Sequence, residues 1–497
     1  MSDIEVRSPV DGRVVGAVPN YSADEVDAVV GGLRATQTGW GGLSVSERVG
    51  WLSKYRDWLL DHEFDLAKLL QSETGKPWAE SNLEIPYIVD AINYYTRIAA
   101  HALADRRPRR HGLFALTKRQ LLVSRPYPVV GVITPWNFPL GLSLLDTVPA
   151  LLAGAAVLVK PSEVTPLTVV EAIDGWRQIG APSVLAAVTG AGQTGAAIVD
   201  RVDFVQFTGS TRTGKAIAQA AAQRLIPCGL ELGGKDAMIV LDDADMSRAA
   251  NAAVWGAIAN AGQMCTSVER VYVEEPVYEA FVAAIIEEIR KLRIGADDQS
   301  YRSDVGPLIT GQQVDIVREH LADAVAKGAR IVIGGGVRDG SHFVEPTVLV
   351  DVDHGMLCMQ QETFGPLLPV VKVGDEAEAI RLANDSPYGL SATVFSRDSV
   401  RAQRVARKIN AGAVTINDVF ANLFTLALPQ GGWNESGLGT RNGENAITKF
   451  CRPQAIVTAR LRPRREPAWY PYTQMRGAIM HRAARLINAR NLKRIIG

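Results

Sequence analysis

Cysteine is scarce in this sequence, and so is any cysteine or histidine pattern that would hold a metal. The 497 residues include four cysteines, at positions 228, 265, 358 and 451, and seven scattered histidines. No C-x-x-C or H-x-x-x-H spacing occurs. These absences argue against a disulfide framework and a zinc site, and they suit a reducing compartment such as the cytoplasm. We therefore expect no bound metal.

The chain also lacks net charge and a targeting segment. Lys and Arg number 53, as do Asp and Glu, so nothing in the bulk charge indicates nucleic-acid binding. The polar N-terminus MSDIEVRSPVDGRVVG lacks the basic start and apolar stretch of a signal peptide. The long apolar segment 129–160 is interrupted by Pro135, Pro139, Asp146 and Pro149. It therefore favours buried strands and a helix over a membrane span.

Strand-like and helical patterns alternate along most of the chain, which is too long for one hydrophobic core. The strand-like runs are VVGVIT, AAVLVK, FVQFTG, AMIVL, RVYVEE, RIVIGG and AVTIN, and the clearest helical patterns are VDAVVGGLRATQTGW and YEAFVAAIIEEIRKL. Continuous apolar strands between helices predict an α/β fold with parallel sheets covered on both faces. The alternation occurs twice, over about 129–240 and 268–417, which predicts two domains joined near 231–236.

The C-terminal segment 461–497 differs in charge. It holds nine Arg or Lys residues and one Glu, which leaves 44 basic and 52 acidic residues in the rest of the chain. An apolar stripe of Met475, Ile479, Leu486 and Ile487 lies beside basic residues, namely Arg476, Arg482, Arg485, Arg490, Lys493 and Arg494. Three alternatives stay open: a helix docked on the acidic body or on a partner subunit, a surface helix that meets anionic lipid, or a disordered tail.

Three residues could together supply nucleophilic catalysis by a cysteine. Such chemistry needs a thiolate, a base for a later water step and donors for an oxyanion. The candidates are Cys265 in GQMC, Glu231 in LELGGK and Asn137 in PWNFP. Taken alone, a cysteine in this context is more often a small buried apolar residue than a nucleophile.

Three further segments are weak signals of nucleotide binding. GAGQTG at 190–195 matches G-x-G-x-x-G, but Ser210 and Thr211 lie where an acidic residue is expected about 20 residues later. FTGSTRTG at 207–214 follows a strand and opens a helix, so its N–H groups would suit a diphosphate. KPSE at 160–163 could bracket ribose hydroxyls between its Lys and Glu. Each segment could also be a turn with solvated charges.

Taken together, these motifs resemble those of the aldehyde dehydrogenase superfamily. PWNFP, KPSEVTP, FTGSTRTG, LELGGKDA, GQMC and ETFGP occur in that order, and the resemblance runs from SPVDGRVVGAVP through SETGKPWAE to SPYGLSATVFSRD and GAVTIND. It implies two Rossmann-like domains, one for the cofactor (1–108 and 127–232) and one for catalysis (233–433). It also implies a β-strand oligomerisation arm (109–126 and 446–460), whose strands would be LFALTKRQLLVSR and ITKFCRPQAIVTAR. A homodimer or homotetramer and a basic extension at 461–497 complete the expectation.

The resemblance further implies NAD-dependent oxidation of an aldehyde to an acid. Cys265 would attack the aldehyde, Asn137 and the Cys265 N–H would hold the oxyanion, and Glu231 would activate the water that hydrolyses the thioester. The implied cofactor contacts are Ile133, Thr134, Pro135, Trp136, Lys160, Ser162, Glu163, Gly192, Thr208, Gly209, Ser210, Leu232, Gly233, Glu362 and Phe364. A carboxylate such as Glu163 accepts hydrogen bonds from a ribose 2′-hydroxyl but repels a 2′-phosphate, which favours NAD over NADP.

One segment departs from the family pattern, and the substrate stays open. LPQGGWNESGLGTRNG at 428–443 carries Gln430, Trp433 and Asn434 in place of the usual aromatic residue and Lys. The expected tunnel is mostly apolar without an inward Arg, with a lining of Leu140, Leu144, Trp255, Met264, Thr266 and Phe424. This lining disfavours a carboxylate-bearing semialdehyde, although GQMCTSVER is similar to sequences of succinate-semialdehyde dehydrogenases.

Two alternative classes remain. A CoA-acylating enzyme would resolve the thioester with CoA instead of water, and the presence of Glu231 argues against it. A non-catalytic relative that binds NAD or a membrane would be expected to have lost Cys265, Glu231 or Asn137, and all three are present.

Overall fold

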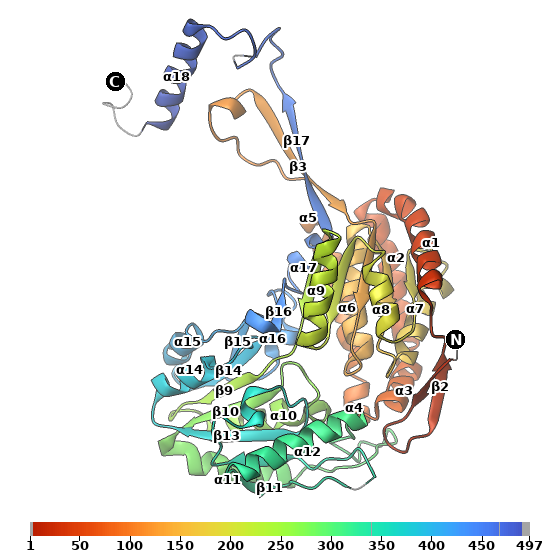
Figure 1. The fold of residues 1–497 in the computed structure, drawn as a ribbon, viewed down its shortest axis with the longest axis vertical. Coiled ribbons are helices and arrows are strands. Elements are labelled where there is room, and N and C mark those ends of the chain that lie inside the picture. Colours follow the sequence, from red (N-terminus) through yellow and green to blue (C-terminus); the bar gives the residue numbers. More distant parts are fainter. Residues whose placement is uncertain (1–2, 339, 467, 490–497) are drawn as a thin grey trace.

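Two large β-sheets with helices packed against them form the body of the protein, and a two-stranded arm extends from it (Figure 1). The computed structural model describes residues 3–338, 340–466 and 468–489. The tail positions Arg490, Lys493 and Arg494 therefore lie outside the described residues. The architecture confirms the predicted α/β class with two Rossmann-like units.

The first sheet has six strands in the order β16-β8-β7-β4-β5-β6. Its strands are β4 (Val129–Ile133), β5 (Ala156–Lys160), β6 (Leu185–Ala187), β7 (Phe204–Thr208), β8 (Cys228–Glu231) and β16 (Gly437–Leu438). All pairs are parallel except β16 with β8. Every residue of β4, β5 and β7 is buried, because helices cover both faces, and this explains their unbroken apolar runs.

The helices of this first unit begin and end at recognisable signals. They are α1 (Ala23–Gly42), α2 (Val45–Asp61), α3 (Glu63–Thr74), α4 (Trp78–Ser81), α5 (Glu84–Ala102), α6 (Pro139–Ala153), α7 (Leu167–Gln178), α8 (Gly192–Val199) and α9 (Thr211–Gln223). Capping boxes at Ser22 and Ser44 start α1 and α2. A small hairpin of β1 (Ile4–Arg7) and β2 (Val14–Val18) lies at the N-terminus.

The long apolar segment of the sequence becomes β4, α6 and β5. Pro139 is the first residue of α6, where its missing N–H costs no hydrogen bond, and nearly all of α6 is buried. In the described part of the chain, no helix is both long enough and apolar enough to cross a membrane.

The second sheet has seven strands in the order β11-β12-β13-β10-β9-β14-β15. They are β9 (Asp236–Val240), β10 (Val268–Glu274), β11 (Arg330–Ile333), β12 (Thr347–Val350), β13 (Leu367–Val373), β14 (Ser391–Phe395) and β15 (Ala413–Ile416). RIVIGG was expected as a parallel strand, and this is wrong for its orientation: β11 pairs antiparallel with β12. The chain from β11 to β12 contains no helix, so it cannot make the crossover that a parallel pair requires.

The helices of the second unit pack around this sheet. They are α10 (Met246–Ile258), α11 (Glu275–Arg290), α12 (Gly311–Ala326), α13 (Leu357–Gln360), α14 (Glu376–Asn384), α15 (Ser399–Ala406) and α16 (Ala421–Phe424). Two short segments near the C-terminal end of the body are η3 (Asn434–Ser436) and α17 (Asn445–Thr448).

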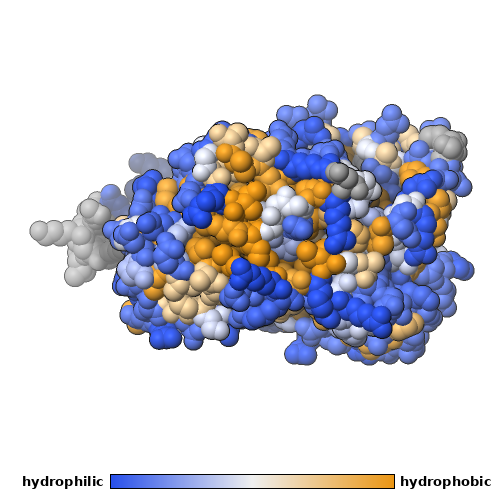
Figure 2. All heavy atoms as spheres, turned by 90° about the horizontal axis from the view of Figure 1, so that it is seen from below, coloured by the Kyte–Doolittle hydropathy of each residue, from blue (hydrophilic) through white to orange (hydrophobic). Residues whose placement is uncertain are grey.

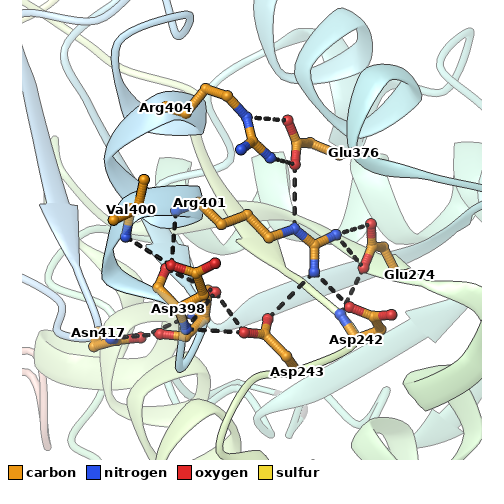
Figure 3. A network of polar contacts seen from close by, with 10 residues as sticks. Asp242, Asp243, Glu274, Glu376, Asp398, Val400, Arg401, Arg404 and Asn417 are labelled. Carbon is orange, nitrogen blue, oxygen red and sulfur yellow. Dashed lines mark hydrogen bonds and ion pairs between the residues drawn. The ribbon is translucent and has the colours of Figure 1, made fainter.

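The carboxyl edge of the second sheet is occupied by an ion-pair network around Arg401 (Figure 3). Arg401 lies on α15 and contacts Glu274 at the end of β10 at 2.9 Å and Glu376 on α14 at 3.2 Å. It also contacts Asp242 and Asp243, which follow β9. Carboxyl ends of parallel strands often form ligand sites, but here the Arg401 guanidinium bonds to the carboxylates and ties the strand ends together.

The two sheets meet at opposite kinds of edge. β8 ends at Glu231 and β9 begins at Asp236, so a short link carries the chain directly from one sheet to the other. The carboxyl edge of the first sheet therefore faces the amino edge of the second, and the segments before β10 and β13 lie next to the ends of β4, β7 and β8.

The arm is a long antiparallel pair of β3 (Lys118–Pro126) and β17 (Cys451–Ala459), in register from Cys451 opposite Pro126 to Ala459 opposite Lys118. The expected strand 113–125 is wrong in its first residues, because a 3-10 turn, η1 (Leu113–Ala115), follows Gly112 with its φ of 79°. Beyond the arm, the tail forms the helix α18 (Gln474–Asn488), which lies next to η1 and far from the body (Figure 1).

The structure decides part of the question left open for the tail. The described tail residues form a helix, and this helix has no buried residue and does not dock on the body of its own chain. Figure 2 shows apolar side chains over the middle of the face that lies opposite the arm. Because α18 lies on the arm side, it does not cover this apolar patch.

Candidate active site

A tight backbone turn precedes Cys265. Helix α10 ends at Ile258, and η2 (Ala259–Gly262) follows with φ values of 53° at Asn260, 53° at Ala261 and 75° at Gly262. A Cβ at Gly262 would lie 2.2 Å from the Gly365 carbonyl oxygen, so only glycine fits both this φ and this space.

The buried Gln263 side chain holds this turn through two hydrogen bonds. Its Oε1 accepts from the Ile309 N–H at 2.8 Å, and its Nε2 donates to the Asn260 carbonyl at 2.8 Å. The motif GQMC is thus a backbone constraint: the glycine allows the turn and the glutamine side chain holds it, which fixes where the Cys265 thiol lies.

Cys265, Glu231 and Asn137 line one cavity of about 170 Å³. They come from the turn before β10, the end of β8 and the loop after β4. The Asn137 Nδ2 donates to the Gln263 carbonyl at 2.9 Å, which uses one of its two hydrogens. The second hydrogen of this amide remains available to a ligand in the cavity.

Burial dominates the electrostatics of the two reactive side chains. Desolvation, with a smaller contribution from the nearby carboxylates of Glu362 and Asp236, raises the pKa of Cys265 to about 12. Desolvation also raises the pKa of Glu231 to about 7, against the opposing charges of Arg441 and Lys449. Near neutral pH the thiol is therefore protonated in the resting structure, while Glu231 exchanges its proton readily.

A buried cluster of Arg441, Asp146 and Lys449 lies behind Glu231, and no sequence motif indicates it directly. The Arg441 guanidinium donates to Asp146 Oδ2 at 2.7 and 2.9 Å and to the Thr208 hydroxyl, and Lys449 donates to Asp146 Oδ1 at 3.0 Å. Burial acts to raise the pKa of Asp146, but the two cations outweigh it and hold this pKa below its usual value.

Arg441 lines the cavity, so the expectation of a tunnel without an inward Arg is wrong. Its charge is already matched by Asp146, however, and both side chains are almost fully buried. The one sequence feature that could have indicated this buried ion pair was Asp146, an acidic residue in the middle of an apolar helical segment.

Most of the remaining cavity wall is apolar. Its apolar members are Leu83, Tyr87, Phe138, Leu142, Leu145, Trp255, Met264, Phe420, Leu423 and Phe424. Of the residues expected to line the tunnel, Trp255, Met264, Thr266 and Phe424 do so, whereas Leu140 and Leu144 are wrong. Those two leucines lie on the other side of α6 in the core, and Leu142 and Leu145 face the cavity instead.

The predicted cofactor residues gather along the carboxyl edge of the first sheet. Ile133, Lys160 and Thr208 end β4, β5 and β7. The strand order changes direction between β4 and β7, because β5 and β6 extend to one side and β7 and β8 to the other. Such a switch point is where open α/β sheets bind their ligands.

Two loops at this edge have the chemistry to contact a dinucleotide. Gly209 and Ser210 lead into α9, and the Ser210 hydroxyl caps that helix by accepting from the Thr213 N–H. Lys160 Nζ lies 3.6 Å from Glu163, whose carboxylate is partly exposed. A Cβ at Gly192, the first residue of α8, would meet open space, and Gly195 one turn later lies beside the Lys160 side chain.

Other predicted contacts are committed to the fold through their polar groups. The Thr208 hydroxyl accepts from Arg441, the Thr134 hydroxyl bonds to Ser143 at 2.8 Å, and the Ser162 hydroxyl accepts from the Val164 N–H at 3.3 Å. The Leu232 N–H donates to the Ser436 carbonyl at 2.9 Å. These bonds position the groups along the cleft, and the Thr208 and Ser162 hydroxyls, which are acceptors here, keep their own hydrogens to donate to a ligand.

The second sheet supplies the opposite side of the cleft. The Gly234 N–H donates to Glu362 Oε1 at 3.2 Å, and a Cβ at Gly233 would lie 2.3 Å from Glu362 Oε2. The Phe364 ring meets Trp136, which follows Pro135 after β4, edge to face at 5.4 Å. The loop from Glu362 to Phe364 thus bridges the two units directly across the site.

A buried carboxylate holds this loop. Glu269 accepts from the Thr363 N–H at 2.8 Å and from the Phe364 N–H at 2.9 Å, and it is paired with the buried Lys235. Removing one partner of a buried ion pair leaves an uncompensated charge. The loss of either Lys235 or Glu269 would therefore destabilise the loop from Glu362 to Phe364.

The fold and this site agree with the comparisons to known proteins. The model of the aldehyde dehydrogenase family matches residues 1–456, and the chain belongs to that family. It is therefore an oxidoreductase that oxidises an aldehyde.

Three relatives illustrate the similarity. A 4,4'-diapolycopene aldehyde oxidase from Methylomonas sp is 42% identical over 476 residues, which are 95% of this chain and 89% of the relative. A protein from Mycolicibacterium smegmatis with the provisional name succinate-semialdehyde dehydrogenase (NADP+) is 39% identical, over 90% of this chain and 87% of the relative. The structure of a provisionally assigned aldehyde dehydrogenase, PutA from Anabaena variabilis, superposes with a TM-score of 0.90 at 38% identity, and covers 95% of this chain and 100% of that chain.

Proposed function

We propose that this enzyme oxidises a long, apolar aldehyde to its carboxylic acid with NAD, through a thioester on Cys265. The observation that supports this most is one cavity that brings the Cys265 thiol, the Asn137 amide and the Glu231 carboxyl together within mostly apolar walls.

Cys265 and Asn137 carry the first step. The Cys265 thiol releases its proton to water, its sulfur adds to the aldehyde carbon, and the carbonyl oxygen becomes an alkoxide. The free hydrogen of Asn137 Nδ2 and the backbone N–H of Cys265 are the donors for that oxygen. Such donors are most effective when they are fixed beforehand, and Asn137 is fixed by its hydrogen bond to Gln263.

The residues of the cleft fit a dinucleotide. Lys160 and Glu163 would hold the adenosine ribose, the N–H groups at Gly209 and Ser210 would meet the diphosphate, and Glu362 and Phe364 would hold the nicotinamide ribose and ring. A Cβ at Gly192 would meet open space, so the start of α8 leaves room for a ligand. NAD supplies the acceptor for the hydride that leaves the carbon attached to Cys265.

Glu231 carries the last step. It takes a proton from water as the water oxygen attacks the thioester carbon, the carbon–sulfur bond breaks, and the acid leaves while Cys265 regains its thiol. A base with a pKa of about 7 suits this role, because it is ionised for much of the time yet basic enough to accept the proton. A CoA-acylating enzyme would need no such base.

The walls of the cavity favour an apolar substrate. The mouth is formed by Leu83, Trp255 and Phe424, which are 63%, 50% and 56% exposed although all three line the cavity. A long aldehyde could keep its far end in contact with these side chains. The relative named as a 4,4'-diapolycopene aldehyde oxidase supports a polyene aldehyde as the substrate class.

Succinic semialdehyde is the second candidate, since other relatives carry the name of that activity. A carboxylate-bearing substrate needs an unmatched cation in the tunnel. Arg441 is the cation that lines the cavity, and Asp146 already neutralises it.

NAD is proposed over NADP on the basis of Glu163. Its carboxylate would lie against the ribose 2′-hydroxyl and repel a 2′-phosphate. The neighbouring Lys160 contacts Glu163 and the Pro161 carbonyl, so its charge is partly neutralised and attracts a 2′-phosphate less.

For the assembly we propose a homodimer or homotetramer built through the arm, and for the location the cytoplasm.

Reduced-cofactor formation measured by absorbance tests the proposal. The wild type would be assayed with polyene, medium-chain, aromatic and succinic aldehydes, with NAD and NADP in parallel and with or without CoA. We expect the highest kcat/KM with long apolar aldehydes and NAD, independent of CoA. A preference for succinic semialdehyde with NADP would replace the proposed substrate and cofactor, and silence with every aldehyde would favour a non-catalytic relative.

A further inference from the structure

The tip of the arm and the helix α18 form one surface that is both basic and apolar. The segment 107–117 at the tip contains Arg107, Arg109 and Arg110, and α18 lies next to it at η1. Both segments lie far from the body (Figure 1). The matched family region ends at residue 456, so α18 lies beyond it.

The helix itself is amphipathic. Met475, Ile479 and Leu486 are four and seven residues apart, which places them on one side of the helix, and they are 72%, 60% and 63% exposed. Arg482 and Arg485 lie beside this stripe, and α18 contains no acidic residue. A solvent-exposed helix would not be expected to carry three large apolar side chains in line unless something covers them.

Aromatic side chains extend the same surface. Trp469, Tyr470 and Tyr472 precede α18 and are all exposed, as are Phe114 and Leu116 on the arm tip. Tyr and Trp combine an apolar ring with a polar end, and they are favoured where water meets lipid.

The charge of this surface is almost entirely positive. Glu466 is the one acidic residue of the described tail, and it is paired with Lys118 at 2.6 Å. Basic residues beside an exposed apolar stripe match a bilayer with anionic headgroups, because the guanidinium groups meet phosphates while the apolar side chains enter the acyl boundary.

We propose that α18 and the arm tip beside it dock this enzyme on an anionic lipid surface, while the paired strands β3 and β17 are left for the proposed subunit contact. The apolar stripe enters the bilayer interface and the Arg residues bind the headgroup phosphates. The proposal holds whichever aldehyde is oxidised.

Co-sedimentation of the full-length protein with vesicles tests it, with vesicles of phosphatidylcholine alone or mixed in equal parts with phosphatidylglycerol. We expect the wild type to bind only the mixed vesicles and to be released by high salt, which screens the attraction. Ile479→Glu and the double variant Arg482→Glu, Arg485→Glu should each reduce binding about tenfold or more.

Matched controls come from exposed positions on the body. Val400→Glu changes an apolar side chain that is 72% exposed, and the pair Arg302→Glu, Arg407→Glu makes the same charge change as the double variant. These controls should bind like the wild type, and all variants should keep the wild-type turnover of a soluble aldehyde.

A wild type that stays in the supernatant with anionic vesicles overturns the proposal, and so does binding that both α18 variants leave unchanged. If Ile479→Glu instead lowers the oligomer mass in sedimentation velocity, and vesicles capture no wild type, α18 packs against a partner subunit.

Discussion

Arg441 donates two hydrogen bonds to Asp146, at 2.7 and 2.9 Å, in a buried pair behind the Glu231 carboxyl. The positive charges of Arg441 and Lys449 act to lower the pKa of Glu231, and burial acts more strongly to raise it, with a result of about 7. The pair therefore adjusts the basicity of the group that is proposed to activate water.

Replacing Arg441 should move the pH dependence of turnover. Glu231 must be ionised to accept a proton, so kcat should rise with pH through about 7 in the wild type. Arg441→Met removes a charge that lowers this pKa, so the rising limb should shift to higher pH. The measurement is kcat against pH under conditions where thioester hydrolysis limits turnover.

Arg441→Lys serves as the control because it keeps the charge, and its profile should stay near that of the wild type. Lys449 still pairs with Asp146 in both variants, and thermal unfolding would show whether each remains folded. A profile that is identical in Arg441→Met and the wild type would contradict the electrostatic role.

Gly262→Ala should disrupt the turn before the nucleophile. The new Cβ would lie 2.2 Å from the Gly365 carbonyl oxygen at a φ of 75°, so the backbone must move. We expect a loss of at least about 2 kcal/mol in the free energy of unfolding, together with most of the activity. Gly32→Ala in α1 is the matched control, since its Cβ meets no atom within 4 Å and should stabilise the helix by about 0.5–1 kcal/mol. If both substitutions change the free energy of unfolding equally, the turn at Gly262 does not require glycine.

Asn137→Ala should lower kcat without abolishing cofactor binding. The loss of one preorganised oxyanion donor typically costs about 100- to 1,000-fold in kcat. Single-turnover kinetics and a binding titration with NAD would separate the two effects. A variant that keeps its single-turnover rate would rule out the Asn137 amide as the oxyanion donor.

Phe424→Ala tests the substrate class through the cavity mouth. Phe424 packs edge to face on Tyr87 at 5.5 Å, and the Tyr87 hydroxyl donates to the Leu423 carbonyl at 2.8 Å, so its ring is well placed. We expect kcat/KM to fall about tenfold for long apolar aldehydes and little for propionaldehyde. Val325→Ala, an exposed apolar position outside the cavity, should change neither value. If Phe424→Ala lowers kcat/KM equally for both kinds of aldehyde, the Phe424 ring supports the fold and does not select the substrate.

The sequence predicted the two α/β units because buried parallel strands leave long apolar runs. It named Cys265, Glu231 and Asn137 because their motifs resemble those of the aldehyde dehydrogenase superfamily. It did not predict the pairing of Arg441 with Asp146, which are 295 residues apart. Nor did it predict which side of α6 faces the cavity, since a shift of one or two positions exchanges Leu144 for Leu142 or Leu145. The antiparallel orientation of β11 was missed because a buried apolar run is the same in either direction.

The most direct test of the central claim is the single turnover of Glu231→Gln with NAD and a long apolar aldehyde. We expect a burst of reduced cofactor that approaches one per active site, followed by little further turnover, and an acyl adduct found by peptide mass mapping on Cys265. Sustained turnover at the wild-type rate, or an adduct on Cys228, Cys358 or Cys451 in place of Cys265, would contradict it.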